Sequence, residues 1–421
     1  MAVETGLGTT AREALSSACD RVEEPGERDL VDGVRPGVVA RPATTEQVAE
    51  VLRAAAGHGL TVVPRGSGTK MTWGQAPTSA DVLVDVSAMD RVLDHAAGDL
   101  IVDVEAGARL SEVQEHLAGA GQRLGLDETV PGASVGGTLA TNASGAQRLL
   151  TGTARDLLIG VTLVRADGVV AKAGGRVVKN VAGYDLGKLL IGSFGTLAVV
   201  TRAVFRLHPV PAARAWVSAP VGDATDAHRL VQVLVHSQAV PSAVEIDWPA
   251  SGPRVVSVLL EGRPGGVEGR VASARAALGT GAEVADPPSA VATYPWTTGL
   301  RGDDRATALK LTFVISGLAE VLTAVGEAAA PVSLRGSVGT GVVYAEIPVG
   351  TDAAAVVSTI DGLRAACARN SGALVVIDAP AAVKQSVDVW GPVGALDLMR
   401  RVKHRFDPEH RLAPGRFVGG I

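Results

Sequence analysis

The sequence predicts an α+β protein of two main domains, on three observations. Its 421 residues exceed what one ordinary domain needs. Strand-like and helix-like runs follow one another along most of the chain, and the segment His208-Pro209-Val210-Pro211 separates two halves of different character. We expect an N-terminal extension over 1–30, a first domain over 31–211, a second over 212–390, and a C-terminal helix and tail over 391–421 that packs back on the first domain.

In the first half, Thr44 or Thr45 can cap a helix that ends at Gly57 and Gly59. A strand over Leu60–Val63 is expected to stop at Pro64. The stretch from Val130 to Gly145 has no clear helical or strand periodicity. Further expected elements are strands at Val82–Val86, Ile101–Glu105 and Leu197–Leu207, helices at Leu110–Leu117 and Asp185–Ile191, and a hairpin of Leu157–Val164 with Val169–Lys172.

In the second half, strand-like runs alternate with alanine-rich helical runs. The order is typical of two successive β-α-β-β-α-β units, over about 213–285 and 308–379. One antiparallel sheet covered by helices fits that order. A last helix is expected over 392–406.

Composition excludes several classes of protein. A net charge of −5 gives no overall field that attracts nucleic acid. Two cysteines, Cys19 and Cys367, are too few for an iron–sulfur cluster or a structural zinc site. No secretory signal and no apolar run long enough to span a bilayer is present, so we expect a cytoplasmic protein, with membrane association only through partners.

Glycine-rich loops carry the main chemical signal. In Pro64-Arg65-Gly66-Ser67-Gly68-Thr69-Lys70, glycines alternate with small polar residues after a strand. Glycine lets the backbone approach a ligand closely, and successive N–H groups in such a turn bind anions. A pyrophosphate fits this loop, although an ordinary surface turn is the alternative. Two more such stretches follow, over 131–145 and 179–197.

Other motifs fit less well. The dinucleotide pattern G-x-G-x-x-G fails because Met71 stands at its last glycine. The segment Gly183–Lys188 matches a Walker A loop only loosely. Gly132-x-Ser134-x-Gly136 has the form of a nucleophile elbow, but no buried strand is expected before it.

Three motifs in order resemble one known family. They are Pro64–Thr69, Pro131-Gly132-x-Ser134-Val135-Gly136-Gly137-Thr138, and Gly192-Ser193-x-Gly195-Thr196-Leu197. They are similar to the PCMH-type FAD-binding domain of the vanillyl-alcohol oxidase and p-cresol methylhydroxylase superfamily. Lys179–Leu186 is most similar to the FAD-binding subunit of bacterial glycolate oxidase. The tail from Phe406 to Phe417 resembles the C-terminal motif of the superfamily, with Ala413 where asparagine is usual.

The resemblance implies a PCMH-type FAD-binding domain of two α+β subdomains, followed by an α+β cap domain. It implies that the first loop holds the pyrophosphate, and that the second stretch contacts the ribityl and isoalloxazine groups. The first loop has no histidine for a covalent link, so non-covalent FAD is expected. The implied FAD contacts are Pro64, Arg65, Gly66, Ser67, Gly68, Thr69, Lys70, Pro131, Gly132, Ser134, Val135, Gly136, Gly137, Thr138, Asn142, Ser144, Gly145, Asn180, Gly183, Gly195, Val200 and Arg416.

The resemblance also implies oxidation of a small 2-hydroxy acid, glycolate or D-lactate, with hydride transfer to FAD and onward electron transfer. Such chemistry needs a cationic clamp for the carboxylate and a base for the hydroxyl proton. Arg301, Arg335 and Lys384 are candidate clamps, although each is also consistent with plain surface charge, and no base is identified. The paired-histidine metal motif of related dehydrogenases is absent from the sequence, so no metal is expected.

Three hypotheses remain open. The chain is a subunit of a glycolate oxidase complex that includes a paralogous flavin subunit, where most substrate chemistry would occur, and a separate iron–sulfur subunit. Alternatively, it is a standalone FAD-dependent oxidoreductase of another alcohol or hydroxy acid. The third hypothesis is a structural subunit with a vestigial flavin site.

Overall fold

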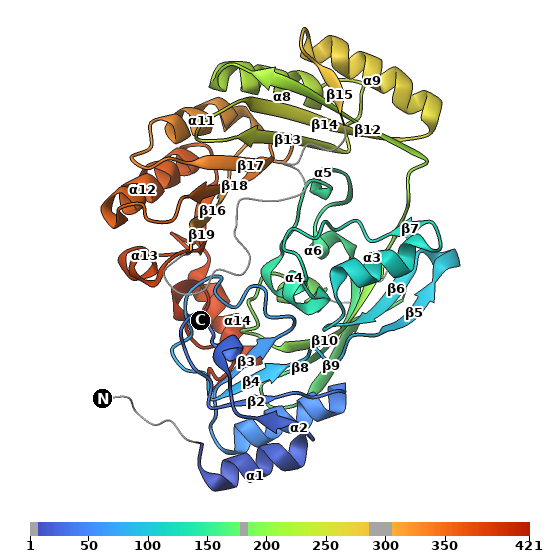
Figure 1. Ribbon diagram of the computed structural model, residues 1–421. Helices are drawn as coiled ribbons and strands as arrows, with labels where there is room; N and C mark the ends of the chain where they lie inside the picture. Colours follow the sequence, from blue (N-terminus) through green and yellow to red (C-terminus); the bar gives the residue numbers. More distant parts are fainter. Residues whose placement is uncertain (1–6, 177–183, 286–304) are drawn as a thin grey trace.

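The computed structural model describes residues 7–176, 184–285 and 305–421. The described residues form an N-terminal domain with two main sheets and a small two-stranded one, and a second domain with one large sheet, which lies above the first domain in Figure 1. The α+β fold class predicted from the sequence is confirmed.

The first sheet has the strand order β1-β2-β4-β3, where β1 is Val22–Glu23, β2 is Val38–Ala40, β4 is Val82–Asp85 and β3 is Val62–Arg65. The pairs β2–β4 and β3–β4 are parallel. Helix α2 (Thr45–Gly57) makes the crossover between β2 and β3, and α1 (Thr9–Ala18) packs against it. The side chain of Thr44 caps α2 by accepting a hydrogen bond from the Gln47 N–H at 3.1 Å.

The expectation that Pro64 ends its strand is wrong. Strand β3 continues through Pro64, which lies opposite Val84 of β4, to Arg65. Proline has no N–H to donate. Because β3 is the last strand of this sheet, no further strand of the sheet requires a hydrogen bond from Pro64.

The second sheet is antiparallel, in the order β5-β6-β10-β8-β9. Its strands are β5 (Val92–Ala96), β6 (Ile101–Glu105), β10 (Val199–Arg206), β8 (Leu158–Val164) and β9 (Val170–Gly174). The predicted hairpin is confirmed as the pair β8–β9. Five helices accompany this sheet within the described residues: α3 (Leu110–Ala118), α4 (Val135–Thr141), α5 (Arg148–Thr151), α6 (Ala154–Leu157) and α7 (Leu186–Leu190).

Helix α4 corrects the expectation of an irregular stretch between Val130 and Gly145. Gly136 and Gly137 lower helix propensity by roughly 1 kcal/mol each, which hides the helix in the sequence. Two contacts outweigh that cost. The hydroxyl of Ser134 caps the helix by accepting from the Gly137 N–H, and Val135 and Leu139 are buried in the core beneath the second sheet.

The second domain contains one eight-stranded antiparallel sheet, in the order β15-β12-β14-β13-β17-β18-β16-β19. Its first unit is β12 (Ala213–Val221), α8 (Ala224–Val235), β13 (Ala243–Trp248), β14 (Arg254–Gly262), α9 (Pro264–Leu278) and β15 (Glu283–Ala285). Its second is β16 (Thr307–Thr312), α11 (Leu318–Gly326), β17 (Ser333–Ser337), β18 (Val342–Ile347), α12 (Ala353–Arg369) and β19 (Ala373–Asp378). The two predicted units are confirmed, and β13 and β17 join them.

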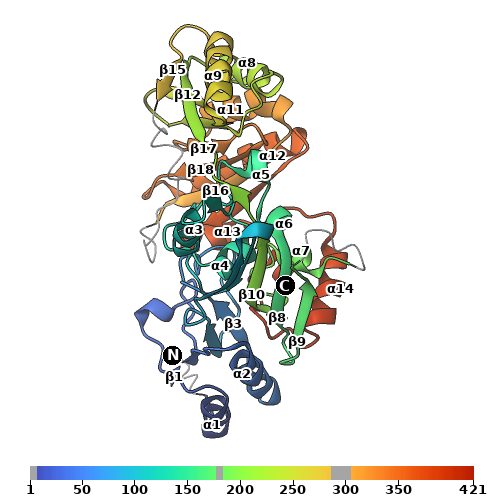
Figure 2. The same cartoon turned by 90° about the vertical axis from the view of Figure 1, so that its right-hand side faces the viewer.

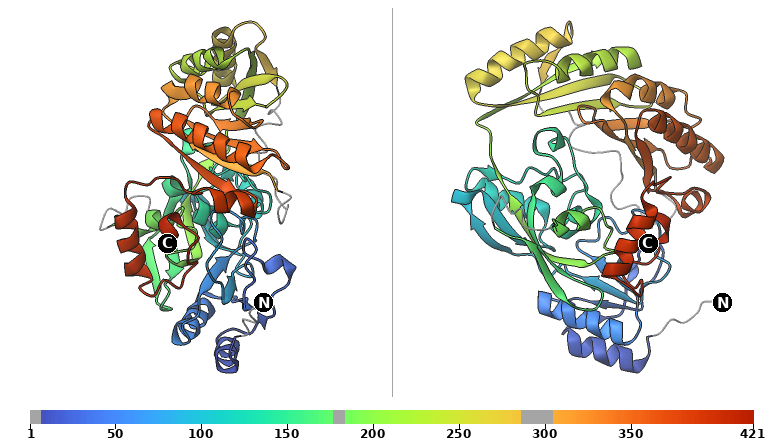
Figure 3. Two further views of the ribbon diagram at one scale, coloured as in Figure 1. Left: turned by 90° about the vertical axis from the view of Figure 1, so that its left-hand side faces the viewer. Right: turned by 180° about the vertical axis from the view of Figure 1, so that it is seen from behind.

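The four long helices of this second domain lie on the outer face of its sheet, as Figures 1 and 3 show. Its opposite face is turned toward the N-terminal domain. Contact between the domains includes a bidentate ion pair, in which Arg123 donates two hydrogen bonds of 2.8 Å to Glu261. Arg123 lies on β7 (Gln122–Arg123), which pairs with β11 (His208–Pro209).

The chain then returns to the N-terminal domain through α13 (Ala381–Ser386) and α14 (Leu396–Phe406). Figure 2 shows α14 beside β8 and β9, and Val402 and Phe406 pack on the core of the second sheet. The tail then lies along β3. The Val62 N–H donates to the Arg411 carbonyl, and the Ala413 N–H donates to the Val62 carbonyl, both at 2.8 Å.

A buried ion pair anchors this tail. Lys403 and Asp407 have fully buried side chains, and Lys403 Nζ lies 2.7 Å from Asp407 Oδ2. The ammonium also donates to the carbonyls of Thr196 and Leu412, each at 2.8 Å. Burial lowers the pKa of Lys403, and Asp407 opposes that shift. The three bonds hold the tail against the segment that precedes β10.

We predict that Lys403→Met destabilises the protein by about 3–5 kcal/mol, because it leaves the Asp407 carboxylate buried without its cation. Urea unfolding followed by circular dichroism measures this. Lys188→Met, which removes an exposed ion pair with Asp185, is the matched control and should change stability by less than about 1 kcal/mol. Equal losses in the two variants would contradict the prediction.

Candidate functional site

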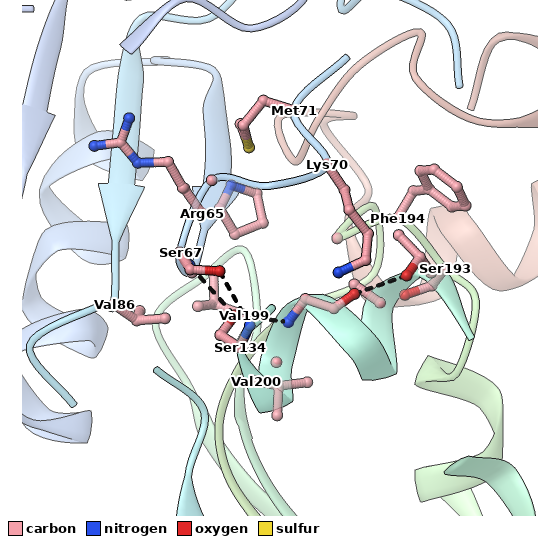
Figure 4. A pocket seen from close by; sticks show the side chains of 18 of the residues that line it. Arg65, Ser67, Lys70, Met71, Val86, Ser134, Ser193, Phe194, Val199 and Val200 are labelled. Atoms are coloured by element: carbon pink, nitrogen blue, oxygen red, sulfur yellow. Dashed lines mark hydrogen bonds between the residues drawn. The ribbon is translucent and has the colours of Figure 1, made fainter. Parts of the chain in front are cut away.

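A cavity of about 760 Å³ lies in the N-terminal domain between the two sheets, and Figure 4 shows it from close by. Its walls come from the loop after β3, the first turns of α4, and the segment that leads into β10. The lining residues are 64–71, Val86, Ser134, Gly136, Gly137, Ala140, Thr141, Leu190, 193–195, 198–200 and Arg416.

The first two glycine-rich stretches are tied together at this cavity. The Ser134 N–H donates to Ser67 Oγ at 3.0 Å, and the Ser67 N–H donates to Ser134 Oγ at 3.3 Å. Gly66 lies so close that an added Cβ would be 2.1 Å from Ser134 Oγ. The absence of a side chain at Gly66 is therefore a packing requirement.

The first loop offers donors to an anion. Within the described part of the chain, no hydrogen bond engages the backbone N–H groups of Gly68 and Thr69. Gly68 has φ +78°, a left-handed conformation that favours glycine. Lys70 is buried beside them, and its Nζ would lie 3.8 Å from a Cβ added at Gly137. Burial lowers the pKa of Lys70 to about 8, with Glu128 opposing the shift. These groups fit a bound pyrophosphate.

Arg65 does not add its charge to the cavity. Its guanidinium lies 2.7 Å from Asp29 and 2.7 Å from Asp85, and Figure 4 shows it turned away from the loop. Arg416 is also buried, and it donates to the carbonyls of Met71 at 3.0 Å and Trp73 at 2.8 Å. Arg65 and Arg416 line the cavity, but their guanidinium groups are bonded to other protein groups and so stabilise the shape of the loop.

A second cavity, of about 740 Å³, adjoins the first, because Thr141 and Phe194 line both. It lies where the N-terminal domain meets the second domain's sheet. Its lining residues are Trp73, Gly74, 141–143, Gly192, Phe194, Lys310, Tyr344, 375–377 and Trp390.

Lys310 is the cation of this second cavity. It lies on β16, directly opposite Tyr344 of β18 and Val375 of β19. Its side chain is deep in the protein yet keeps accessible surface toward the cavity, and no described residue hydrogen-bonds or ion-pairs with it. Burial and, to a lesser extent, the positive charge of Arg148 together lower the pKa of Lys310 to about 8. An anion in the cavity would supply the missing partner.

Other polar atoms near the second cavity also lack partners. Asn142 Oδ1, Ser144 Oγ and Trp390 Nε1 are buried without a hydrogen bond in the described structure. Asn142 and Trp390 line the cavity, and the Ser144 carbonyl accepts a hydrogen bond from the Tyr344 hydroxyl at 3.2 Å. Buried polar groups in native proteins are nearly always paired. Such orphans are expected where a polar ligand binds.

The structure separates the residues implied by the resemblance into four sets. Those lining the first cavity are Pro64–Lys70, Ser134, Gly136, Gly137, Gly195, Val200 and Arg416. Asn142 lines the second cavity. Pro131, Gly132, Val135, Thr138, Ser144 and Gly145 line neither, and of these Val135, Thr138, Ser144 and Gly145 are buried. Asn180 and Gly183 lie outside the described residues.

The expected carboxylate clamps need correction. Lys384 already pairs with Asp32 at 2.8 Å and Asp378 at 3.3 Å, so it is not free to bind a substrate. Arg335 pairs with Asp247 at 2.7 Å. Arg301 lies outside the described residues. Lys310 was missed because a lysine in a strand is usually solvent-facing. The pattern that could have revealed it is its position between the buried Leu309 and Leu311, because alternation along a strand points Lys310 to the face opposite their core.

Comparison with known proteins agrees with a cofactor site in this part of the chain. The family described as "FAD binding domain" matches residues 36–174. A glycolate oxidase subunit, GlcD, of Bacillus subtilis is 30% identical over 216 residues, which are 51% of this chain and 46% of the relative. A D-lactate dehydrogenase of Archaeoglobus fulgidus is 33% identical over 228 residues, covering 52% of this chain and 51% of the relative. The matched part thus spans about half the length of these curated relatives.

Solved structures extend the likeness to the whole chain. p-Cresol methylhydroxylase with bound substrate superposes with a TM-score of 0.73 at 16% identity, covering 96% of each chain. An alkyldihydroxyacetonephosphate synthase gives a TM-score of 0.74 at 16% identity, covering 99% of this chain and 86% of the other. The chain is therefore an FAD-binding protein with the p-cresol methylhydroxylase fold. At 16% identity this likeness shows the fold, while the family match over residues 36–174 shows the FAD binding domain.

The described residues also bear on membrane insertion and metal binding. None of the helices there is both long and apolar enough to cross a bilayer. The same residues contain no group of three or more His, Cys, Asp or Glu side chains suited to a metal ion. That no metal is used stays a prediction.

We predict that Gly66→Ala weakens FAD binding, because its Cβ must displace Ser134 and open the contact between the loop and α4. A cost of about 1–3 kcal/mol corresponds to a rise in Kd of roughly 5- to 150-fold, measurable by titrating apoprotein with FAD. Gly57→Ala is the control, since a Cβ added there, at the end of α2, would meet nothing within 4 Å. Unchanged FAD affinity in Gly66→Ala would contradict the assigned cavity.

We also predict a pH dependence of FAD affinity. A bound pyrophosphate stabilises the ammonium form of Lys70, so the pKa of Lys70 is higher in the complex than its value of about 8 in the free protein. Affinity should be constant below about pH 8 and fall as pH rises above it. Lys70→Met should bind FAD more weakly and lose the slope, whereas the exposed-site variant Lys172→Met should keep both. A slope that persists in Lys70→Met would rule out Lys70 as its source.

Proposed function

We propose that the chain is an FAD-dependent oxidoreductase that oxidises a 2-hydroxy acid to the 2-oxo acid. One observation carries the proposal: Lys310, half-buried and without a partner among the described residues, faces a cavity that adjoins the FAD cavity. A 2-hydroxy acid has one carboxylate for such a cation. The names of the similar glycolate oxidase subunit and D-lactate dehydrogenase support the same substrate class.

Different residues of the chain would bind the cofactor and the substrate. Gly68, Thr69 and Lys70 would bind the FAD pyrophosphate, and Lys310 would bind the substrate carboxylate by a charge-assisted hydrogen bond. The substrate loses a hydride from its alcohol carbon and a proton from its hydroxyl. Bound FAD would supply the hydride acceptor. The apolar walls formed by Trp73, Phe194 and Ile377 would exclude water from the reacting carbon.

We further propose that the chain acts as a subunit of a complex organised like glycolate oxidase, with a paralogous flavin subunit and an iron–sulfur subunit as partners, whatever 2-hydroxy acid the complex oxidises. The relative from Bacillus subtilis is named as a subunit, and two cysteines cannot hold an iron–sulfur cluster on this chain. Electrons from reduced FAD would then leave through the partners. A cytoplasmic location, with any membrane contact made by partners, agrees with this arrangement.

The second cavity favours substrate oxidation on this chain over a vestigial flavin site, because a site without a ligand gives no reason to keep Lys310 half-buried with no partner among the described residues. Anaerobic mixing of the purified FAD-loaded chain with 2-hydroxy acids tests this. We expect bleaching of flavin absorbance near its visible maximum, and a roughly 10- to 100-fold lower second-order rate constant in Lys310→Met. If the flavin reduces only when a paralogous subunit is added, substrate oxidation belongs to that partner.

FAD is expected to be bound non-covalently. Within the described structure, no His, Cys or Tyr lines the first cavity to supply a covalent link. Acid precipitation of the purified protein should therefore release the yellow cofactor into the supernatant. Yellow colour that remains with the polypeptide pellet would contradict this prediction.

A further inference from the structure

The second cavity is apolar over most of its wall. Trp73 and Phe194 come from the N-terminal domain, and Tyr344, Ile377 and Trp390 come from the second domain. Phe194 meets Trp390 edge-on with ring centroids 4.9 Å apart, so this part of the wall is fixed by packing. The cavity is open to solvent on one side, so a ligand body can extend along this wall.

Polar groups in this cavity are few. Lys310 supplies the cation, and Asn142 supplies an amide oxygen that has no partner among the described residues. Val375 is the cross-strand neighbour of Lys310 on β19 and lines the same cavity, so an aliphatic surface lies next to the lysine on the wall of the cavity. The complementary ligand has a single anionic head and an apolar body attached close to it.

We propose that the second cavity selects 2-hydroxy acids with a bulky apolar side chain, branched aliphatic or aromatic, over glycolate and D-lactate. The carboxylate lies at Lys310, and the side chain covers the wall formed by Ile377, Val375 and Trp390. This inference rests on the proposed function for its hydroxyl group, although the demand for an apolar carboxylate comes from the cavity alone.

Burial of apolar surface provides the selectivity. Glycolate has no side chain and D-lactate has one methyl group, so both leave the aromatic and aliphatic wall in contact with water or empty space. Each additional buried methylene favours binding by about fourfold. The branched chain of D-2-hydroxyisocaproate should therefore raise the ratio kcat/KM at least about tenfold above that of D-lactate.

The test uses the full-length FAD-loaded chain and a series of substrates: glycolate, D-lactate, D-2-hydroxyisocaproate and D-phenyllactate. Stopped-flow flavin reduction gives a second-order rate constant for each. We expect the constant to rise with the apolar side chain, and to be lowest for glycolate. Glycolate or D-lactate reducing the flavin as fast as D-2-hydroxyisocaproate would overturn the inference while leaving the proposed oxidation of 2-hydroxy acids intact.

A binding assay separates the two proposals. Phenylacetate and 4-methylvalerate have the apolar body and the carboxylate but no hydroxyl to oxidise, and acetate is the small control. We expect the two larger acids to perturb the flavin spectrum at concentrations at least about tenfold lower than acetate. If they bind in this way while no hydroxy acid reduces the flavin, the proposed function fails and the ligand chemistry of the cavity stands. Equal affinity for all three acids overturns the inference.

Variants assign the binding to this cavity. Lys310→Met should weaken phenylacetate binding roughly 10- to 100-fold, and Lys310→Arg should retain most of it because the charge is kept. Lys172→Met, a change on exposed β9, is the matched control and should bind as the parent does. Val375→Phe reduces the space beside Lys310 and should lower the advantage of phenylacetate over acetate. Phenylacetate binding that is unchanged in both Lys310→Met and Val375→Phe places the ligand elsewhere and overturns the inference.

Discussion

The two cavities adjoin because a buried group of four charges fixes the second domain on the first. Asp32, in the N-terminal segment, lies 2.7 Å from Arg305 and 2.8 Å from Lys384. Asp378, at the end of β19, lies 3.2 Å from Arg305 and 3.3 Å from Lys384. Two anions and two cations balance one another. Burying such a group is costly in desolvation and stabilises little, but it tolerates only one relative placement of its members.

The same group reaches the FAD loop. Lys384 donates to the Thr72 carbonyl, and the Thr72 hydroxyl donates to Asp378 at 2.6 Å. Two residues earlier, Lys70 faces the first cavity, and one residue later, Trp73 lines the second. The glycine-rich loop of the first cavity is thus fixed to the end of the strand that lines the second cavity. A shift of the second domain would move both cavities at once.

The sequence predicted the first cavity much better than the second, for a physical reason. A cofactor held by backbone N–H groups requires glycines at fixed spacings, so Gly66 and Gly68 are visible as a motif. The repeated β-α-β-β-α-β order was visible because strand and helix periodicities alternate clearly. Helix α4 was hidden, since Gly136 and Gly137 disfavour a helix locally and only the Ser134 cap and the burial of Leu139 decide for it.

The second cavity depends on strand register, which sequence does not display. Lys310, Tyr344 and Val375 are far apart in sequence and meet because β18, β16 and β19 pair side by side. Sequence alone leaves Lys384 available as a carboxylate clamp, because its ion-pair partners, Asp32 and Asp378, lie on distant elements of the chain.

The two cavities thus differ in what determines their lining. The glycine-rich loops line the first cavity, whereas side chains on one sheet face line the second, and these side chains can change without disturbing the loops. Cofactor identity therefore follows from the motifs, while substrate identity must be read from the register of β16, β18 and β19.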